Sequence, residues 1–231
     1  MKFNPFRDLL RIFFPATCYH CGTPLVGDER YLCLNCQLQI STNTAIIAPN
    51  NITEQRLGGR IPLVAGASYM HYIKGTPSQT ILHQLKYYGN TKIGYTYGQL
   101  LGNALRLSGR FDDIDVLIPV PLHHFKQWQR GYNQSEILCK GIASTFPHPI
   151  EKHLLQRNTY TQTQTHKNRI QRMENMQGVF SIKHPERLNG KHILLVDDVI
   201  TTGATTDACW ETLKTIPNLR ISIASLAITN T

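Results

Sequence analysis

The sequence predicts an α/β protein in which a mostly parallel sheet is flanked by helices. Short apolar runs that suit buried strands alternate with stretches whose apolar residues recur at helical spacing. This alternation is typical of parallel strands joined by right-handed helical connections. The chain has 231 residues, 41% of them hydrophobic, enough for one large domain and a small module. The predicted strands are residues 63–72, 115–120, 193–196 and 221–228, and the predicted helices are residues 79–88, 93–107, 135–144 and 205–216.

One segment, residues 193–205, carries most of the functional information. It reads Ile-Leu-Leu-Val-Asp-Asp-Val-Ile-Thr-Thr-Gly-Ala-Thr. The apolar residues predict a buried strand, Asp197 and Asp198 follow where it is expected to end, and a helix begins after the Thr-Gly loop. Open α/β sheets bind ligands at this edge, and the unpaired N–H groups at a helix start attract anions. The alternative is an ordinary strand and capped helix, which two adjacent acids make less favourable because they repel each other.

This segment resembles the signature with which type I phosphoribosyltransferases bind 5-phosphoribosyl 1-pyrophosphate (PRPP). The resemblance implies a type I phosphoribosyltransferase-like fold. It assigns the catalytic role to Asp197 and Asp198, which are expected to hold the ribose hydroxyls while magnesium bridges to the pyrophosphate. The 5-phosphate is expected to lie against Thr201, Thr202, Gly203, Ala204 and Thr205.

A second group of anion contacts is predicted after the second strand, which ends at prolines because proline cannot donate to a strand ladder. In type I phosphoribosyltransferases a loop after a comparable strand cradles pyrophosphate. By this resemblance Val120 belongs to the PRPP site, and Lys126 and Arg130 are expected to supply side-chain donors. For Arg130 the alternative is a surface position near the start of a helix.

Residues 156–175 are polar and basic, and they contain almost no apolar residues to hold them to a core. Long loops of this composition are either lids or disordered. A lid over pyrophosphate would use Lys167, Arg169 and Arg172, with a short helix at residues 169–176. A flexible surface insertion is an equally good alternative.

The N-terminal part contains two Cys-x-x-Cys pairs separated by eleven residues. Such spacing predicts a closed tetrahedral site for a structural zinc ion, because four thiolates leave no position open for chemistry. Disulfides are disfavoured in a reducing cytosol, and a redox Cys-x-x-Cys motif usually stands alone. The predicted metal ligands are Cys18, Cys21, Cys33 and Cys36.

The predicted domain boundary follows from this motif. A helix at residues 3–16 and the zinc module form the first unit, residues 1–45. The phosphoribosyltransferase-like domain forms the second, residues 46–231. Residues 37–60 are predicted to be a polar linker.

The formal net charge is +9 at neutral pH, and most of it lies in the middle of the chain. Residues 122–192 contain 11 Lys and Arg against 4 Asp and Glu, a net charge of +7. Such a surface favours polyanions such as pyrophosphate or nucleic acid, although a solvated basic face is an equal alternative. No apolar run approaches the roughly 20 residues that span a bilayer, so a cytoplasmic protein without a transmembrane segment is expected.

Several motifs in order along the chain resemble the ComF/ComFC competence family. The family resemblance implies a zinc finger before a phosphoribosyltransferase fold. It also implies a role in natural transformation, handling incoming single-stranded DNA with DNA-uptake proteins at the inner face of the membrane. Residues 161–166, Thr-Gln-Thr-Gln-Thr-His, depart from the family pattern, so the register of the lid is not fixed. The matching motifs are the cysteine module, residues 85–89, 119–121, 130–134, 157–159 and 172–175, and the PRPP signature.

Three functions fit these features. The first is an active phosphoribosyltransferase that transfers phosphoribose to an unidentified nitrogen nucleophile. The second is a DNA-uptake factor in which basic residues and aromatic residues line a single-strand path. The third is a non-catalytic PRPP sensor, and the sequence gives no oligomeric state for any of them. The aromatic candidates for the DNA path are Tyr87, Tyr88, Trp128, Tyr132 and Tyr160, each with core packing as the alternative.

Overall fold

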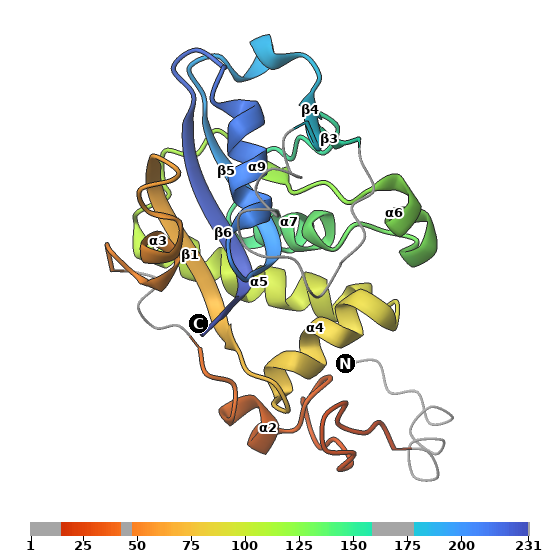
Figure 1. Cartoon of the computed structure of the whole chain (residues 1–231). Coiled ribbons are helices and arrows are strands. Elements are labelled where there is room, and N and C mark those ends of the chain that lie inside the picture. Colours follow the sequence, from red (N-terminus) through yellow and green to blue (C-terminus); the bar gives the residue numbers. More distant parts are fainter. Residues whose placement is uncertain (1–14, 43–47, 159–177, 231) are drawn as a thin grey trace.

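The framework of the protein is a four-stranded sheet in which every pair of neighbours is parallel (Figure 1). The computed structural model describes residues 15–42, 48–158 and 178–230. The predicted α/β class with a parallel sheet is confirmed. The strand order is β1-β6-β5-β2, with β1 at Leu63–Tyr72, β2 at Val116–Pro119, β5 at His192–Ile200 and β6 at Arg220–Thr229.

Helices cover both faces of this sheet. The alternation of side chains along β5 explains why, because Leu194 and Val196 pack into one core while Ile193 and Leu195 pack into the other. Buried residues of α4, α5 and α7 share the first core, and buried residues of α9 and the 3₁₀ helix η2 share the second. The bounds are α4 Pro77–Tyr87, α5 Thr91–Ser108, α7 Gln134–Thr145, α9 Ala204–Leu213 and η2 Pro185–Leu188.

The helices α5 and α7 pack closely because glycines line their contact. A Cβ atom on Gly98 would lie 2.6 Å from the carbonyl oxygen of Leu138, and one on Gly141 would overlap the carbonyl oxygen of Tyr95. The two helix backbones are therefore nearly in contact. The N-terminal end of α7 lies beside the C-terminal end of β2, because the N-cap residue Asn133 donates through Nδ2 to Val120 O at 3.0 Å. The side chain of Asn133 caps the helix by accepting a hydrogen bond from Ser135 N at 3.0 Å.

Several elements were not predicted from the sequence. The predicted linker contains α3 (Ile52–Leu57), whose N-terminal amides donate to the side chain of Asn51. The residues after Pro121 form α6 (His124–Arg130). The predicted lid segment begins as strand β3 (Leu155–Arg157), which pairs antiparallel with β4 (Phe180–Ile182).

β5 continues four residues beyond its predicted end. It continues to Ile200 because β6 stays paired with it, with Val199 opposite Ala227 and Ile200 opposite Ile228. β2 has already ended, with Pro119 opposite Val196. Asp197 and Asp198 therefore lie within β5 and beyond the end of β2, and not after the strand as the sequence suggested.

The chain before β1 contains the four cysteines and the short helix α2 (Leu34–Leu38). It meets the outer edge of β1, where Thr42 forms an antiparallel bridge with Met70 and His71 N donates to Ser41 O at 2.9 Å. The predicted helix at residues 3–16 falls almost wholly outside the described residues. Among the described helices, none combines the length and the apolar character that crossing a membrane requires.

Candidate functional site

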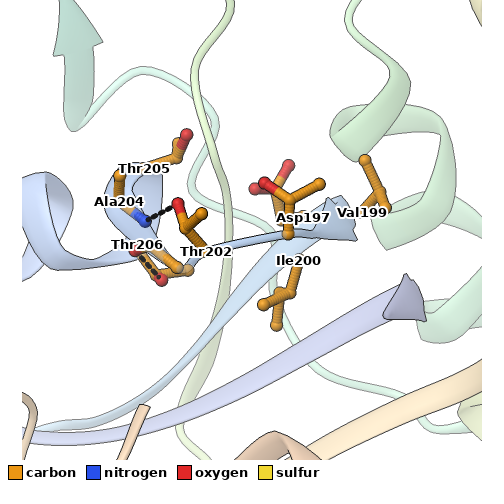
Figure 2. A pocket seen from close by; sticks show the side chains of 9 residues that line it. Asp197, Val199, Ile200, Thr202, Ala204, Thr205 and Thr206 are labelled. Carbon is orange, nitrogen blue, oxygen red and sulfur yellow. Dashed lines mark hydrogen bonds between the residues drawn. The ribbon is translucent and has the colours of Figure 1, made fainter. Parts of the chain in front are cut away.

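A small pocket of about 50 Å³ lies where β5 leads into α9 (Figure 2). Residues of the predicted phosphate loop form most of its wall, together with the end of β5. Thr201, Thr202 and Gly203 precede the helix, and Ala204 and Thr205 form the start of α9. The structure thus brings together one acid and the whole predicted loop. The lining residues are Asp197, Val199, Ile200, Thr201, Thr202, Gly203, Ala204, Thr205 and Thr206.

Gly203 gives the loop its shape. Its φ angle is +84°, in the left-handed region that residues with a Cβ rarely adopt. A Cβ atom there would also lie 2.5 Å from Leu57 Cδ2 and 2.8 Å from Arg60 Nη2, so α3 lies directly behind the loop. The chain can therefore turn from β5 into α9 with the helix start open to the pocket, and the partial positive charge of that start favours an anion.

Asp197 is the acid that lines the pocket. Its Oδ1 accepts from Asp198 N at 2.8 Å and lies 3.5 Å from Ser135 Oγ. Burial, and then the negative charge of Asp198, raise the pKa of Asp197 from 3.8 to about 7. At neutral pH this side chain therefore exists in both protonation states, so it can accept or donate a hydrogen bond to a ligand.

Asp198 does not line the pocket. Its Oδ1 forms an ion pair of 3.1 Å with Lys86 Nζ of α4, and only 13% of the Asp198 side chain is exposed. The two adjacent acids therefore differ in environment: Lys86 neutralises Asp198, while Asp197 faces the loop. The sequence assigned the binding of ribose hydroxyls to both aspartates, but in the structure only Asp197 lines the pocket.

The cations predicted to hold pyrophosphate gather near these acids. Burial, and then the positive charges of Arg157, Arg130 and Lys86, lower the pKa of Lys126. Arg157, whose guanidinium lies 5.5 Å from the centre of the Phe180 ring, also interacts with the charge of Asp197. Lys86 of α4, Lys126 and Arg130 of α6 and Arg157 of β3 thus bring positive charge to the region beside Asp197. Arg157 was not among the predicted pyrophosphate contacts.

The backbone of Val120 is already used within the fold. Its amide donates to Val196 O at 2.8 Å, and its carbonyl oxygen accepts from Asn133 Nδ2 at 3.0 Å. Val120 therefore has no free amide for a ligand. The predicted lid residues Lys167, Arg169 and Arg172 lie outside the described residues.

Two arginines, Arg56 of α3 and Arg60 in the turn after it, contact the phosphate loop and were missed by sequence reasoning. Arg56 donates to the carbonyl oxygen of Thr201, and Arg60 donates to that of Thr202 at 3.1 Å. Arg60 also forms an ion pair with Asp207 in the first turn of α9. The only local signal was Asn51 followed by Glu54, a pattern typical of a helix start.

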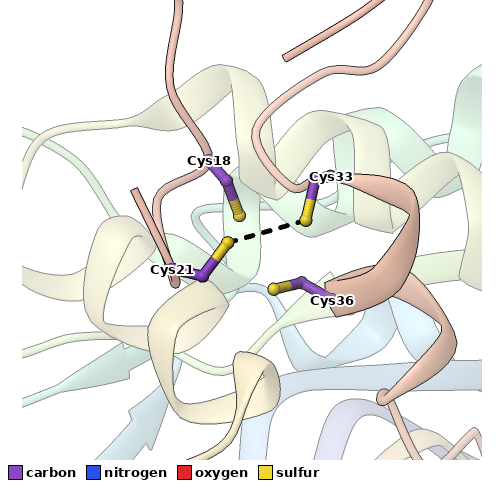
Figure 3. A group of neighbouring side chains, drawn as sticks. All are labelled: Cys18, Cys21, Cys33 and Cys36. Carbon is purple, nitrogen blue, oxygen red and sulfur yellow. Dashed lines mark hydrogen bonds between the residues drawn. The ribbon is translucent and has the colours of Figure 1, made fainter. Parts of the chain in front are cut away.

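The four predicted metal ligands converge on one point (Figure 3). Their Sγ atoms all lie within 4.8 Å of one another, and those of Cys21 and Cys33 are 3.6 Å apart. Tetrahedral coordination with bonds of about 2.3 Å places sulfur atoms about 3.8 Å apart, so the cluster fits a closed metal site. All four are free thiols, and hydrogen bonds with Thr23 lower the pKa of Cys21 to about 6, which favours the thiolate form.

This cluster is joined to the main core. Cys18, Cys33 and Cys36 belong to the same buried group as residues of α4 and α5. His20, which lies between the first two cysteines, bonds to Thr80 Oγ1 on α4 through its Nδ1 at 2.9 Å. A metal bound here would stabilise the contact between the cysteine segment and the sheet domain.

Protein-family models give no match. Competence protein F of Haemophilus influenzae is 28% identical over 93% of this chain and 98% of its own length. The DNA utilization protein YhgH of Salmonella typhi is 31% identical over 83% of this chain and 87% of its own length, and Competence protein ComFC of Bacillus subtilis is 32% identical over 81% and 73%. The chain belongs to the ComF family.

Solved structures resemble this ComF-family chain only weakly. The allosteric regulatory enzyme of purine biosynthesis aligns with 61% of the chain and 29% of its own, at 18% identity and a TM-score of 0.40. Hypoxanthine phosphoribosyltransferase from Trypanosoma cruzi aligns with 59% of the chain and 64% of its own, at 15% identity and a TM-score of 0.36. Similarity of this size does not identify the pocket's ligand.

Replacing a buried metal ligand is expected to remove the metal and loosen the cysteine segment. For Cys36→Ser we expect loss of bound metal and a melting temperature lower by about 5 °C or more, because Cys36 is 1% exposed within the shared core. Metal analysis and thermal unfolding measure both effects. The control His20→Asn should keep the metal, and a Cys36→Ser protein that retains a full equivalent would contradict the assignment.

The pKa of Asp197 predicts a pH-dependent cost to folding. An acid whose pKa is higher in the folded state than in the unfolded state makes the free energy of unfolding fall as pH rises from 3.8 to about 7. Asp197→Asn should therefore be more stable than the wild type at pH 8 by about 1–2 kcal/mol, and the difference should shrink toward pH 4. Urea unfolding at several pH values measures this. The exposed control Asp112→Asn should show no such trend, and an equal difference at all pH values for Asp197→Asn would refute the assignment.

Proposed function

We propose that this ComF-family protein binds PRPP, or a related sugar phosphate, together with magnesium at the pocket between β5 and α9. The observation that carries the proposal is the open Thr-Gly loop at a helix start directly beside Asp197. The 5-phosphate would lie against Thr201, Thr202, Gly203, Ala204 and Thr205. A phosphate suits this place because backbone amides and the helix start both favour an anion.

The remaining polar groups suit the other parts of PRPP. Asp197, with its raised pKa, can hydrogen-bond ribose hydroxyls, and Lys126, Arg130 and Arg157 lie where a pyrophosphate would need positive charge. Magnesium would supply further charge neutralisation when bound with the pyrophosphate. If the protein transfers phosphoribose, its residues would act by positioning and by stabilising the departing pyrophosphate. The described residues do not include an evident reader of an acceptor base, so a non-catalytic sensor remains the competing proposal for the same pocket.

We further propose that the protein handles single-stranded DNA, as the names of its competence and DNA utilization relatives suggest. The supporting observation is an exposed aromatic surface formed by Tyr87 and Tyr88 at the end of α4 and by Phe125 and Trp128 of α6. Trp128 is 81% exposed and Tyr88 is 71% exposed. Large aromatic side chains at such exposure suit base stacking.

Positive charge accompanies this aromatic surface. The guanidinium of Arg130 lies 5.5 Å from the centre of the Tyr87 ring, and the rings of Phe125 and Trp128 are 6.3 Å apart. Lys86, next to Tyr87 in the sequence, pairs with Asp198, so the surface adjoins the proposed PRPP site. Stacking on the rings with phosphates on the cations is the usual arrangement for single strands. Tyr132 was also proposed for this path, but its hydroxyl donates to Leu85 O and its ring packs on the core.

For the cysteine cluster we propose a structural zinc ion. The donor set is four thiols, which zinc prefers and which leave no coordination position open. The division into residues 1–45 and 46–231 and the cytoplasmic location remain proposals of the same kind.

The PRPP proposal is tested by adding one negative charge to the pocket. Thr205→Asp should bind PRPP with magnesium at least about tenfold more weakly than the wild type, because the new carboxylate repels the phosphate. An acid in the first turn of α9 is favourable for the helix, so folding should not suffer. Isothermal titration calorimetry measures the affinity, and Thr205→Asn is the uncharged control. If the wild type does not bind PRPP with magnesium, the proposal is wrong. A separate assay for pyrophosphate release with candidate acceptors would distinguish an enzyme from a sensor.

The DNA proposal is tested by separating stacking from charge. Trp128→Ala and Tyr88→Ala should each weaken binding of oligo-dT by about tenfold without changing its salt dependence. Lys126→Met should reduce the slope of log affinity against log salt by about 0.7, the value for one phosphate contact on a single strand. Fluorescence anisotropy across a salt series measures both. Leu107→Ala, equally exposed on α5, is the control, and aromatic variants that bind like the wild type would refute this surface as the DNA site.

A further inference from the structure

We propose that Arg56 of α3 and Arg60, in the turn that follows α3, position two anion-binding amides of the phosphate loop from behind, without touching the ligand. The inference rests on the proposed function of the pocket as a phosphate site. It assigns a role to a helix that the sequence placed in a linker. Neither arginine lines the pocket.

The two arginines bind consecutive carbonyl groups of the loop. Arg56 Nη1 donates to Thr201 O, and its Nη2 donates to Thr229 O at the end of β6 at 2.8 Å. Arg60 Nη2 donates to Thr202 O at 3.1 Å, and its Nη1 pairs with the carboxylate of Asp207. Each guanidinium thus joins the loop to a second, rigid element, which is β6 for Arg56 and α9 for Arg60.

These bonds fix the direction of the next amides along the chain. A trans peptide is planar, so the carbonyl of one residue and the N–H of the next point in opposite directions. If Thr201 O and Thr202 O face α3, the amides of Thr202 and Gly203 face away from α3, on the side of the pocket. Neither of these two amides donates a hydrogen bond to another residue in the described ranges 15–42, 48–158 and 178–230. They are therefore available to an anion.

The helix α3, which carries Arg56 and leads directly into the turn with Arg60, is firmly held. Glu54 accepts from Gly66 N at 2.9 Å and pairs with Arg110, while Thr53 Oγ1 donates to Ser68 Oγ at 2.7 Å. Ser68 is in turn bonded to Ser225 of β6 at 2.7 Å. α3 is thus fixed to β1 and β6, and can act as a stationary support for the loop. Preorganised donors stabilise an anion without the cost of reorienting them at binding.

The experiment compares arginines that touch the loop with one that only holds the helix. Arg56→Met and Arg60→Met should each weaken binding of inorganic phosphate, and of PRPP with magnesium, by about tenfold or more. Arg56→Lys and Arg60→Lys, which keep one donor and the charge, should lose less. Arg110→Met removes the ion pair with Glu54 but makes no contact with the loop, and should bind within about twofold of the wild type. Isothermal titration calorimetry measures these affinities.

A spectroscopic readout separates positioning from general destabilisation. In ¹H–¹⁵N spectra of the wild type, the Thr202 and Gly203 amide signals should shift on addition of inorganic phosphate, and these shifts should be lost in Arg56→Met and Arg60→Met. If the wild type binds phosphate and both methionine variants bind it equally well, the inference is wrong. It is also wrong if Arg110→Met weakens binding as much as they do. Failure of the wild type to bind phosphate or PRPP would overturn the proposed function, and this role with it.

Discussion

The pairing of β5 with β6 beyond the end of β2 is the constraint on which the candidate site depends. Because of this pairing, Asp197 and Asp198 have strand geometry, and the strand ends at Ile200, directly before the loop that leads into α9. Because neighbouring side chains of a strand point to opposite faces, one acid reaches the pocket and the other reaches Lys86 on α4. Two adjacent carboxylates thereby come to differ in environment: Asp198 is paired with Lys86, whereas burial raises the pKa of Asp197 to about 7. The pocket thus adjoins a neutralised acid, a titrating acid and an open helix start within one short stretch of chain.

The sequence could predict the features that depend on neighbouring residues. The strand, loop and helix of residues 193–205 follow from a local pattern. The spacing of the two Cys-x-x-Cys pairs likewise predicts a four-cysteine cluster directly. The two arginines behind the loop could not be found this way, because Arg56 and Arg60 lie 145 and 142 residues from the loop carbonyls that they contact. α6 was missed because Phe125 and Trp128 are exposed, so the segment shows no apolar face for a core. β3 has three residues and is stabilised by a partner strand more than twenty residues later, which no local pattern reveals.

The cysteine segment and the sheet domain share buried contacts. Three of the four cysteines are buried with residues of α4 and α5. The chain after them leads to α3 and the turn that follows it, where Arg56 and Arg60 contact the phosphate loop. The part of the protein that precedes the first strand therefore supports the sheet at two places. One is the core under α4, and the other is the back of the pocket.

The bridge between Thr42 and Met70 has a consequence for how copies of this protein behave toward one another. β1 is ten residues long and lies at the border of the sheet, where unpaired backbone groups can recruit a strand from another molecule. The segment after the cysteines occupies part of that border through Thr42 and Ser41. If a metal ion holds the cysteine segment in place, its removal would expose the edge of β1 as well as weaken the fold, and the metal-free protein would then tend to self-associate.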